Sequence, residues 1–372
     1  MKENVLQRMQ RIGAEQKIAD FQVKMQMPYG FKVKYARLRA QEFARECEAR
    51  GLNYHVSVGG LDSITLLLFL RAIHIDCPAI SVSLLEDSSI QRVHKQLGVE
   101  CLRPVARYTD DKGIVHRWTK PDVLQYFGFP VLSKEIAAKI EMLQNPSEKN
   151  KTIRHAIITG ETGEYGGNQK HSRMKISQKW LELFGGYENE TEGVNYKTPP
   201  FKVSAKCCYY LKEKPCDDWA REHNSVPYLG LMASEGGRRA KSLKINGCNY
   251  FGQTTIRSAP FAIFNRQDLL QLAIDLQVPV PAIYGTIERN YDGTLYTTKA
   301  QRTGCSMCGF GIHMEKRPHR FDLLRERNPK AWHFWMYECC TDENGQKYGW
   351  ARVLDYIGIK YVNEPVVMDS LF

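Results

Sequence analysis

The stretch that decides the fold is Tyr54-His-Val-Ser-Val-Gly-Gly-Leu-Asp-Ser-Ile-Thr-Leu-Leu-Leu-Phe-Leu-Arg71. Its first five residues are β-prone and suit a short buried strand. Gly59 and Gly60 permit a tight turn that side chains would hinder, and the apolar residues that follow repeat with a helical period. We expect Asp62 or Ser63 to cap this helix. The turn would leave bare N–H groups at a helix N-terminus, which is an anion-binding arrangement.

Alternating strands and helices are expected on both sides of this turn. Residues 79–85 are predicted to form a second parallel strand, followed by a helix at about 89–97 and another strand at 99–105. Upstream, helices are expected at residues 1–28 and at about 35–50. The alternation predicts an α/β fold with a doubly wound, mostly parallel sheet and a helical N-terminal extension. Ligands of such sheets bind at the carboxyl ends of the strands.

Later segments are interpreted from their local pattern. Residues 155–161 are predicted to form a strand that ends in a turn, and residues 133–143 and 265–276 are predicted to form helices. Residues 181–200 are polar and contain a Gly-Gly and a Pro-Pro pair, so we expect an exposed insertion there.

Composition bounds the class of protein. With 372 residues and 43% hydrophobic content, the chain can bury a full core. The net charge of +11 favours nucleic acid or another polyanion as a partner. A solvated surface beside a nucleotide pocket is the alternative. No apolar run is long enough to span a bilayer, and the first residues do not resemble a signal peptide, so we expect a cytoplasmic protein with no membrane partner.

The glycine turn resembles the pyrophosphatase loop, Ser-Gly-Gly-X-Asp-Ser, of the adenine-nucleotide α-hydrolases. Here Val58 replaces the first serine of that loop, and Ser57 lies one place early. The change removes one hydroxyl contact to phosphate, whereas the backbone N–H groups and Ser63 remain. The turn has neither the Lys-Ser/Thr ending of a Walker loop nor the spacing of a dinucleotide fingerprint.

Further blocks extend the resemblance to the phosphoadenylyl-sulfate (PAPS) reductase family, across about residues 50–325. They comprise residues 126–134, 201–215, 230–239 and 303–310. The resemblance implies a HUP-type fold that binds ATP or a sulfonucleotide (adenylyl sulfate, APS, or PAPS) together with Mg²⁺. The implied nucleotide contacts are Ser57, Gly59, Gly60, Asp62, Ser63, Gly160 and Glu161. The implied catalytic residues are Asp62, Ser63, Arg238 and Arg239, the arginines because a planar guanidinium suits phosphate or sulfate; an exposed helix face is the alternative for them.

Several of the eleven cysteines are closely spaced, which favours metal binding or redox chemistry. The pair Cys207-Cys208 and the later Cys305-Ser-Met-Cys308 resemble the cluster pattern of the assimilatory APS reductases. The resemblance implies that these four thiolates hold a [4Fe–4S] cluster, and soft anionic thiolates suit such clusters. Zinc on the same four residues is the first alternative, and buried thiols without a metal are the second. Cys248 and the pair Cys339-Cys340 are further candidates.

The chain departs from the reductases near its end. Their Glu-Cys-Gly-Leu-His tail carries the attacking cysteine, and the nearest match here is Glu338-Cys-Cys-Thr341, with more than thirty residues still to follow. We expect three parts: a helical extension at 1–50, a nucleotide-binding α/β domain at 51–260, and a Cys-rich region at 261–372 that completes the metal site.

Three functions compete. The preferred one is an ATP pyrophosphatase-type transferase that adenylates a substrate for sulfur transfer, with nucleic acid as a candidate acceptor. The second is an APS or PAPS reductase with Cys339 or Cys340 as the nucleophile. The third is a non-catalytic, nucleotide-sensing subunit, for which the helix at 1–28 would contact a partner protein. The same helix is a candidate contact for a sulfur donor.

Overall fold

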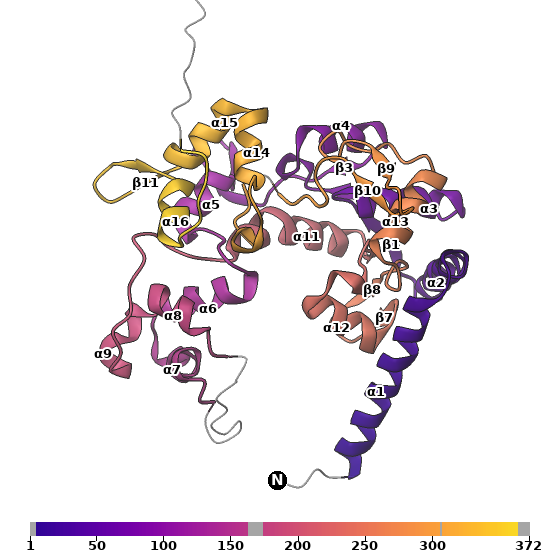
Figure 1. Ribbon diagram of the computed structural model, residues 1–372, viewed down its shortest axis with the longest axis horizontal. Helices are drawn as coiled ribbons and strands as arrows, with labels where there is room; N and C mark the ends of the chain where they lie inside the picture. The colour runs from indigo at the N-terminus through magenta and orange to yellow at the C-terminus, as the bar shows by residue number, and fades with distance from the viewer. Residues whose placement is uncertain (1–4, 163–173, 306, 364–372) are drawn as a thin grey trace, which may run out of the picture. The chain divides into compact units, whose positions relative to one another are not determined.

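The computed structural model describes residues 5–162, 174–305 and 307–363, and the chain divides into two compact units (Figure 1). The first unit comprises Met1–Arg103 and Pro215–Ser306, and the second comprises Pro104–Lys214 and Met307–Phe372. Each unit is therefore built from two separate stretches of chain. The expected boundaries near residues 50 and 260 differ from this division, in which the chain passes between the units after residues 103, 214 and 306. The two hydrophobic cores described below account for the difference.

The first unit contains a six-stranded sheet in the order β3-β2-β1-β6-β8-β7. Its neighbouring strands are parallel except for β7, which runs antiparallel to β8. The strands are β1 (Asn53–Ser57), β2 (Ala79–Ser81), β3 (Glu100–Cys101), β6 (Ser225–Tyr228), β7 (Asn249–Phe251) and β8 (Ile256–Ser258). The predicted α/β class with a mostly parallel sheet is confirmed. β1 lies between β2 and β6, where the order of the chain across the sheet reverses.

Helices of the first unit follow the predicted alternation. They are α1 (Val5–Gln26), α2 (Tyr29–Ala49), α3 (Leu61–Ala72), α4 (Ser88–Gln96), α11 (Lys214–Glu222), α12 (Gly237–Asn246) and α13 (Arg266–Asp275). A small hairpin, β9 (Ile287–Arg289) and β10 (Leu295–Thr297), belongs to the same unit. The first helix ends near residue 28 as predicted, and Pro28 is the N-cap of α2. None of the helices within the described residues is long and apolar enough to cross a membrane.

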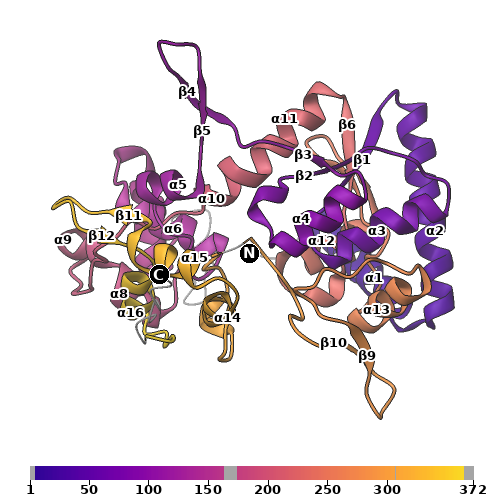
Figure 2. The ribbon, with the colours of Figure 1, turned by 90° about the horizontal axis from the view of Figure 1, so that it is seen from above.

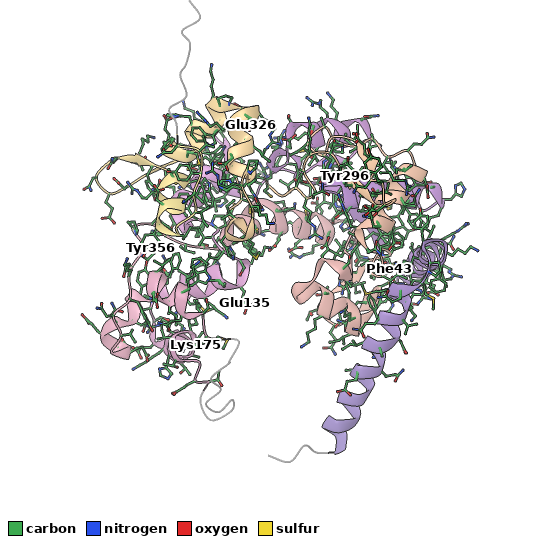
Figure 3. The ribbon with its side chains drawn as sticks, viewed as in Figure 1. Phe43, Glu135, Lys175, Tyr296, Glu326 and Tyr356 are labelled. Carbon is green, nitrogen blue, oxygen red and sulfur yellow. The ribbon has the colours of Figure 1, made fainter. Side chains whose placement is uncertain are left out.

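The core of the first unit explains why its stretches cannot be separated. Ala36, Ala40 and Phe43 of α2 are fully buried in the same apolar cluster as Phe261 and Leu269 (Phe43 is labelled in Figure 3). The α2 helix is thus part of this core rather than an extension. A buried ion pair of 2.7 Å between Lys32 Nζ of α2 and Asp268 Oδ2 of α13 joins the two ends of the unit.

Replacing Lys32 with alanine is expected to lower the free energy of unfolding by about 3–5 kcal/mol, because it leaves the buried Asp268 carboxylate without its cation. Urea titration of the full chain measures the change. Lys34→Ala on the exposed face of α2 is the matched control, and it should change the free energy by less than about 0.5 kcal/mol. Equal effects of the two substitutions would contradict the packing of α2 against α13.

The second unit is mainly helical. It contains the hairpin β4 (Ala106–Thr109) and β5 (Val115–Arg117), the short pair β11 (Cys340–Thr341) and β12 (Lys347–Tyr348), and a set of helices. These are α5 (Lys120–Phe127), α6 (Lys134–Gln144), α7 (Lys151–Thr159), α8 (Gln178–Phe184), α9 (Asn189–Glu192), α10 (Lys206–Cys208), α14 (Arg320–Arg327), α15 (Pro329–His333) and α16 (Trp350–Tyr356). Its separate core includes Phe129, Phe184, Phe321, Trp332 and Trp350.

Two predictions for the second unit are wrong. Residues 155–161 do not begin with a strand: His155 lies in α7, whose buried face carries Ala156 and Ile157 and which ends at Gly160 with φ of 88°. Residues 181–200 are not an exposed insertion, because Leu181 and Phe184 are fully buried in the unit's core. Phe184 meets Tyr356 of α16 at a ring-centroid distance of 5.7 Å (Figure 3 labels Tyr356).

Candidate functional site

The glycine bend lies at the carboxyl edge of the sheet, where the strand order reverses. β1 ends at Ser57, Gly60 is the N-cap of α3, and the helix begins at Leu61. The predicted capping by Asp62 or Ser63 is therefore wrong by two to three residues, since both lie in the first turn. Such a reversal point is where ligands bind in open α/β sheets.

The segment after β6 fits closely against the bend. A Cβ added at Gly230 would lie 3.0 Å from the Ser63 N and Cα atoms and from the Asp62 carbonyl carbon. Glycine at this position lets the β6 connection approach the first turn of α3. The bend is thus enclosed by residues that are distant from it in the sequence.

Several N–H groups of the bend already have oxygen partners. The Gly59 N–H donates to Ser63 Oγ at 2.7 Å, and Ser63 Oγ donates to the Gly60 carbonyl at 3.0 Å. The Leu61 N–H donates to the Tyr284 hydroxyl at 3.1 Å, and that hydroxyl lies 2.5 Å from Thr303 Oγ1. A phenolic oxygen therefore occupies part of the place in which the sequence predicts a phosphate oxygen.

His94 links the bend to Ser83 through two hydrogen bonds. Its Nε2 lies 2.8 Å from the Gly59 carbonyl oxygen and its Nδ1 lies 2.8 Å from Ser83 Oγ. A carbonyl only accepts, so Nε2 donates to it and the Ser83 hydroxyl donates to Nδ1. Because the peptide is planar and trans, fixing the Gly59 carbonyl also directs the Gly60 N–H to the opposite side. His94 is not among the residues predicted from the sequence. Its position on the helix that follows β2 is the only signal that could have suggested it.

Asp62 is paired with a cation. Arg266, the first residue of α13, donates to Asp62 Oδ1 at 2.7 Å and to the Gln301 carbonyl at 2.9 Å. Burial raises the pKa of Asp62, and the charges of Arg266 and Arg302 oppose the rise. Arg266 Nε is buried and has no hydrogen-bond partner within the described residues. Sequence reasoning missed Arg266 as well, because the contact spans two hundred residues of chain.

The other predicted nucleotide contacts are distributed over both units. Gly160 and Glu161 belong to the second unit, where Glu161 Oε2 lies 3.2 Å from His155 Nε2. The bend belongs to the first unit, so the two groups are not part of one compact body. Arg238 and Arg239 lie in the first turn of α12, and their side chains are outside the described part of the chain.

Backbone pairing within the second unit involves residues near three of the four predicted ligands, Cys207, Cys208 and Cys308. The residues 129–132 form parallel bridges with Val203 at one end and with Phe310 at the other. Val203 precedes Cys207-Cys208 by a few residues, and Phe310 follows Cys308. All three of these cysteines and Cys305, which lies at the end of the first unit, are half-buried. Among the described residues, no three His, Cys, Asp or Glu side chains are grouped so that they could hold a metal ion.

The candidate nucleophiles of a reductase are poorly placed for attack. Cys339 and Cys340 are buried, and Cys339 Sγ donates to the Trp335 carbonyl at 3.4 Å. A hydrogen bond with Cys339 and burial raise the pKa of the Cys340 thiol far above its usual range. The thiolate is the reactive form of a cysteine. Burial likewise raises the pKa of Cys248 to about 12.

Comparisons of this chain with protein-family models, with curated proteins and with solved structures found no match. The features of the chain that could carry a function are the bend, with its partners Tyr284, His94 and Arg266, and the two cysteine segments.

Proposed function

We propose that the first unit is a HUP-type pyrophosphatase-loop domain that binds ATP, and that the protein adenylates a substrate for sulfur transfer. The observation that carries the proposal is the bend itself. A diglycine turn begins α3 at the reversal point of a mostly parallel sheet, and its Leu61 N–H already holds an oxygen atom. Helix N-termini with free N–H groups bind phosphate.

The proposed reaction has two balanced steps. A substrate oxygen attacks the α-phosphorus of ATP, so a P–O bond forms and pyrophosphate leaves. A sulfur nucleophile then displaces the adenylated oxygen, and AMP leaves with that oxygen. Catalysis of this kind is mainly positioning and charge neutralisation.

Residues at the bend supply those two effects. The bend N–H groups and Ser63 orient the phosphates, and the buried, unpartnered Nε of Arg266 is a donor for a phosphate oxygen. For a phosphate oxygen to reach the Leu61 N–H, the Tyr284 hydroxyl must leave it. Asp62 would hold Mg²⁺, which neutralises phosphate charge when bound.

We also propose that Cys207, Cys208, Cys305 and Cys308 hold a [4Fe–4S] cluster. The support is the donor set of four thiolates and, within the second unit, the pairing of residues near Cys207, Cys208 and Cys308 with residues 129–132. Zinc suits the same donors. No step of the proposed reaction depends on the metal.

Pyrophosphate release tests the activity. The protein, purified without oxygen, is expected to release pyrophosphate from ATP when a suitable nucleic acid and a sulfide donor are present. Arg266→Ala should lower kcat by about a hundredfold, because charge stabilisation at the phosphates is lost; Arg289→Ala, an exposed arginine in β9 of the same unit, is the control. The proposal would be overturned if calorimetry detected no binding of ATP to the intact protein.

A second candidate function is a non-catalytic subunit that senses nucleotide. The occupation of the bend by Tyr284 favours it, as does the missing loop hydroxyl at Val58. ATP binding without any pyrophosphate release across a broad panel of acceptors, together with a stable complex with a partner protein, would select this function over the first.

A further inference from the structure

Exposed aromatic side chains gather at one end of the second unit. Tyr126 is 60% exposed, Tyr108 is 52% exposed and Tyr209 is 44% exposed. Figure 2 shows that the β4–β5 hairpin, which carries Tyr108, extends beyond α5, which carries Tyr126. We name this the aromatic surface, and it consists of Tyr108, His116, Trp118, Tyr126, Tyr209 and Arg107.

The rings of the aromatic surface form a connected series. Tyr108 and His116 stack across the hairpin at 4.6 Å with an interplanar angle of 13°. The Arg107 guanidinium lies 5.9 Å from the Tyr108 ring and 4.9 Å from the Trp118 ring, so it joins the hairpin to the base of the series. The Trp118 ring lies 5.8 Å from the ring of Tyr126. The series therefore offers several flat faces to solvent.

The hairpin under these rings has little other support. Every residue of β4 and β5 is exposed on both faces. An isolated two-stranded hairpin is only marginally stable in water. A ligand that covers this hairpin would therefore stabilise it. Two of its acidic groups have polar partners: Asp110 accepts the N–H groups of Lys112 and Ile114, and Asp122 pairs with Arg107. A third, Asp111, is exposed at the turn of the hairpin.

The charge and the ring faces together select a class of ligand. The surface carries four cations, Arg107, Lys112, Arg117 and Lys206, against three carboxylates, Asp110, Asp111 and Asp122, so its net charge is slightly positive. Aromatic faces beside cations bind unpaired bases by stacking while the cations meet the phosphates. A groove of about 1400 Å³ continues from Tyr126, with the rings of Phe127 and Tyr187 in its lining. Its charged lining residues are the cations Lys202, Lys206 and Arg352 and the carboxylates Glu141, Asp342 and Glu343. A strand that stacks on the surface can therefore continue along the groove.

We propose that the aromatic surface binds single-stranded nucleic acid, with bases stacked on Tyr108, Tyr126 and Tyr209. In a duplex the base faces are covered, so duplexes should bind much more weakly. The inference deepens the proposed function, because it names the class of acceptor and the surface that presents it. Binding is measured without ATP, so a failure here is distinct from a failure of the bend to bind nucleotide.

Fluorescence anisotropy of labelled oligonucleotides tests the inference on the full chain. Single strands of about 15 nucleotides, DNA and RNA, suit the expected site size, and a duplex of the same sequence is the comparison. Tyr126→Ala and Tyr108→Ala are each expected to weaken single-strand binding about tenfold, whereas Tyr126→Phe keeps the ring and should bind normally. Tyr291→Ala replaces a fully exposed tyrosine of the first unit and should have no effect.

Salt dependence supplies a second measurement. Binding should weaken steeply between about 50 and 200 mM salt, and Arg117→Ala should reduce the slope by about one unit. Quenching of tryptophan fluorescence by unlabelled strands, lost in the alanine variants, would report stacking directly. Circular dichroism of each variant confirms its fold.

Three results would overturn the inference. One is single-strand affinity that the Tyr108 and Tyr126 alanine variants leave unchanged. Another is a duplex that binds the wild-type protein as tightly as the single strand does, and whose affinity falls by the same factor in the alanine variants. The third is a protein partner captured through this surface by a chain that binds no oligonucleotide at low salt.

Discussion

Replacing Gly60 with alanine is expected to lower both the stability of the first unit and its affinity for ATP. The added methyl group would overlap with the Tyr284 hydroxyl and would lie 3.0 Å from Thr303 Oγ1. Tyr284 is buried and its ring cannot move freely, so the overlap must displace packed atoms. Overpacking of this kind costs about 1–3 kcal/mol. The methyl group would also fill the place of a phosphate oxygen.

A second substitution separates these two effects. Tyr284→Phe removes the atom that the new methyl group meets, so the double variant should recover about 1 kcal/mol relative to additivity. Its ATP affinity should stay low, because the methyl group still occupies the bend. Tyr284→Phe alone should bind ATP several times more tightly, since the Leu61 N–H loses its competing acceptor.

Urea titration and calorimetry with ATP measure the stability and the affinity of all three variants. Gly13→Ala is the control, because Gly13 lies in α1 with no atom within 4 Å of an added Cβ. Unaltered ATP affinity in Gly60→Ala would place the nucleotide elsewhere. Weaker binding by Tyr284→Phe would show that its hydroxyl contacts the nucleotide instead of competing with it.

Local signals in the sequence predicted the local structure well. The strand, diglycine turn and helix around Gly60 are encoded within twenty residues, and the structure has them in that order. The helices expected at 133–143 and 265–276 are present because Ser133 and Asn265 each cap a first turn with their side chains. Capping and apolar period act over a few residues, so a single sequence reveals them.

Long-range contacts could not be predicted in the same way. Tyr284, Thr303 and Arg266 reach the bend from more than two hundred residues away. The division into two units also depends on which apolar faces meet. Phe43 of α2, for example, packs against Tyr228 and Phe251, which lie about two hundred residues further along the chain. In the second unit, the apolar run at 155–158 has the length of a strand, and tertiary packing makes it a helix.

Serine substitution at Cys207, Cys208, Cys305 or Cys308 is expected to remove the metal centre almost completely. The wild-type chain, purified without oxygen, should contain about four iron and four sulfide ions and should absorb visible light. A serine hydroxyl is a harder and more weakly acidic ligand than a thiol, so each single variant should lose the iron and the colour. Iron and sulfide assays with absorption spectra measure the change.

The control must be a cysteine with comparable access to solvent. Cys101→Ser meets this need, because Cys101 is exposed at the end of β3 in the first unit and is not one of the proposed ligands. It should retain the full iron content. If the protein is colourless and contains one zinc ion per chain, and the same four variants lose it, then the four cysteines are the ligands but the metal is zinc and not an iron–sulfur cluster. If the wild-type protein contains no metal, or if all four variants keep their iron, these four cysteines are not the ligands of a metal centre. The bend could still bind ATP in either case, because no contact described at Gly60 involves a cysteine.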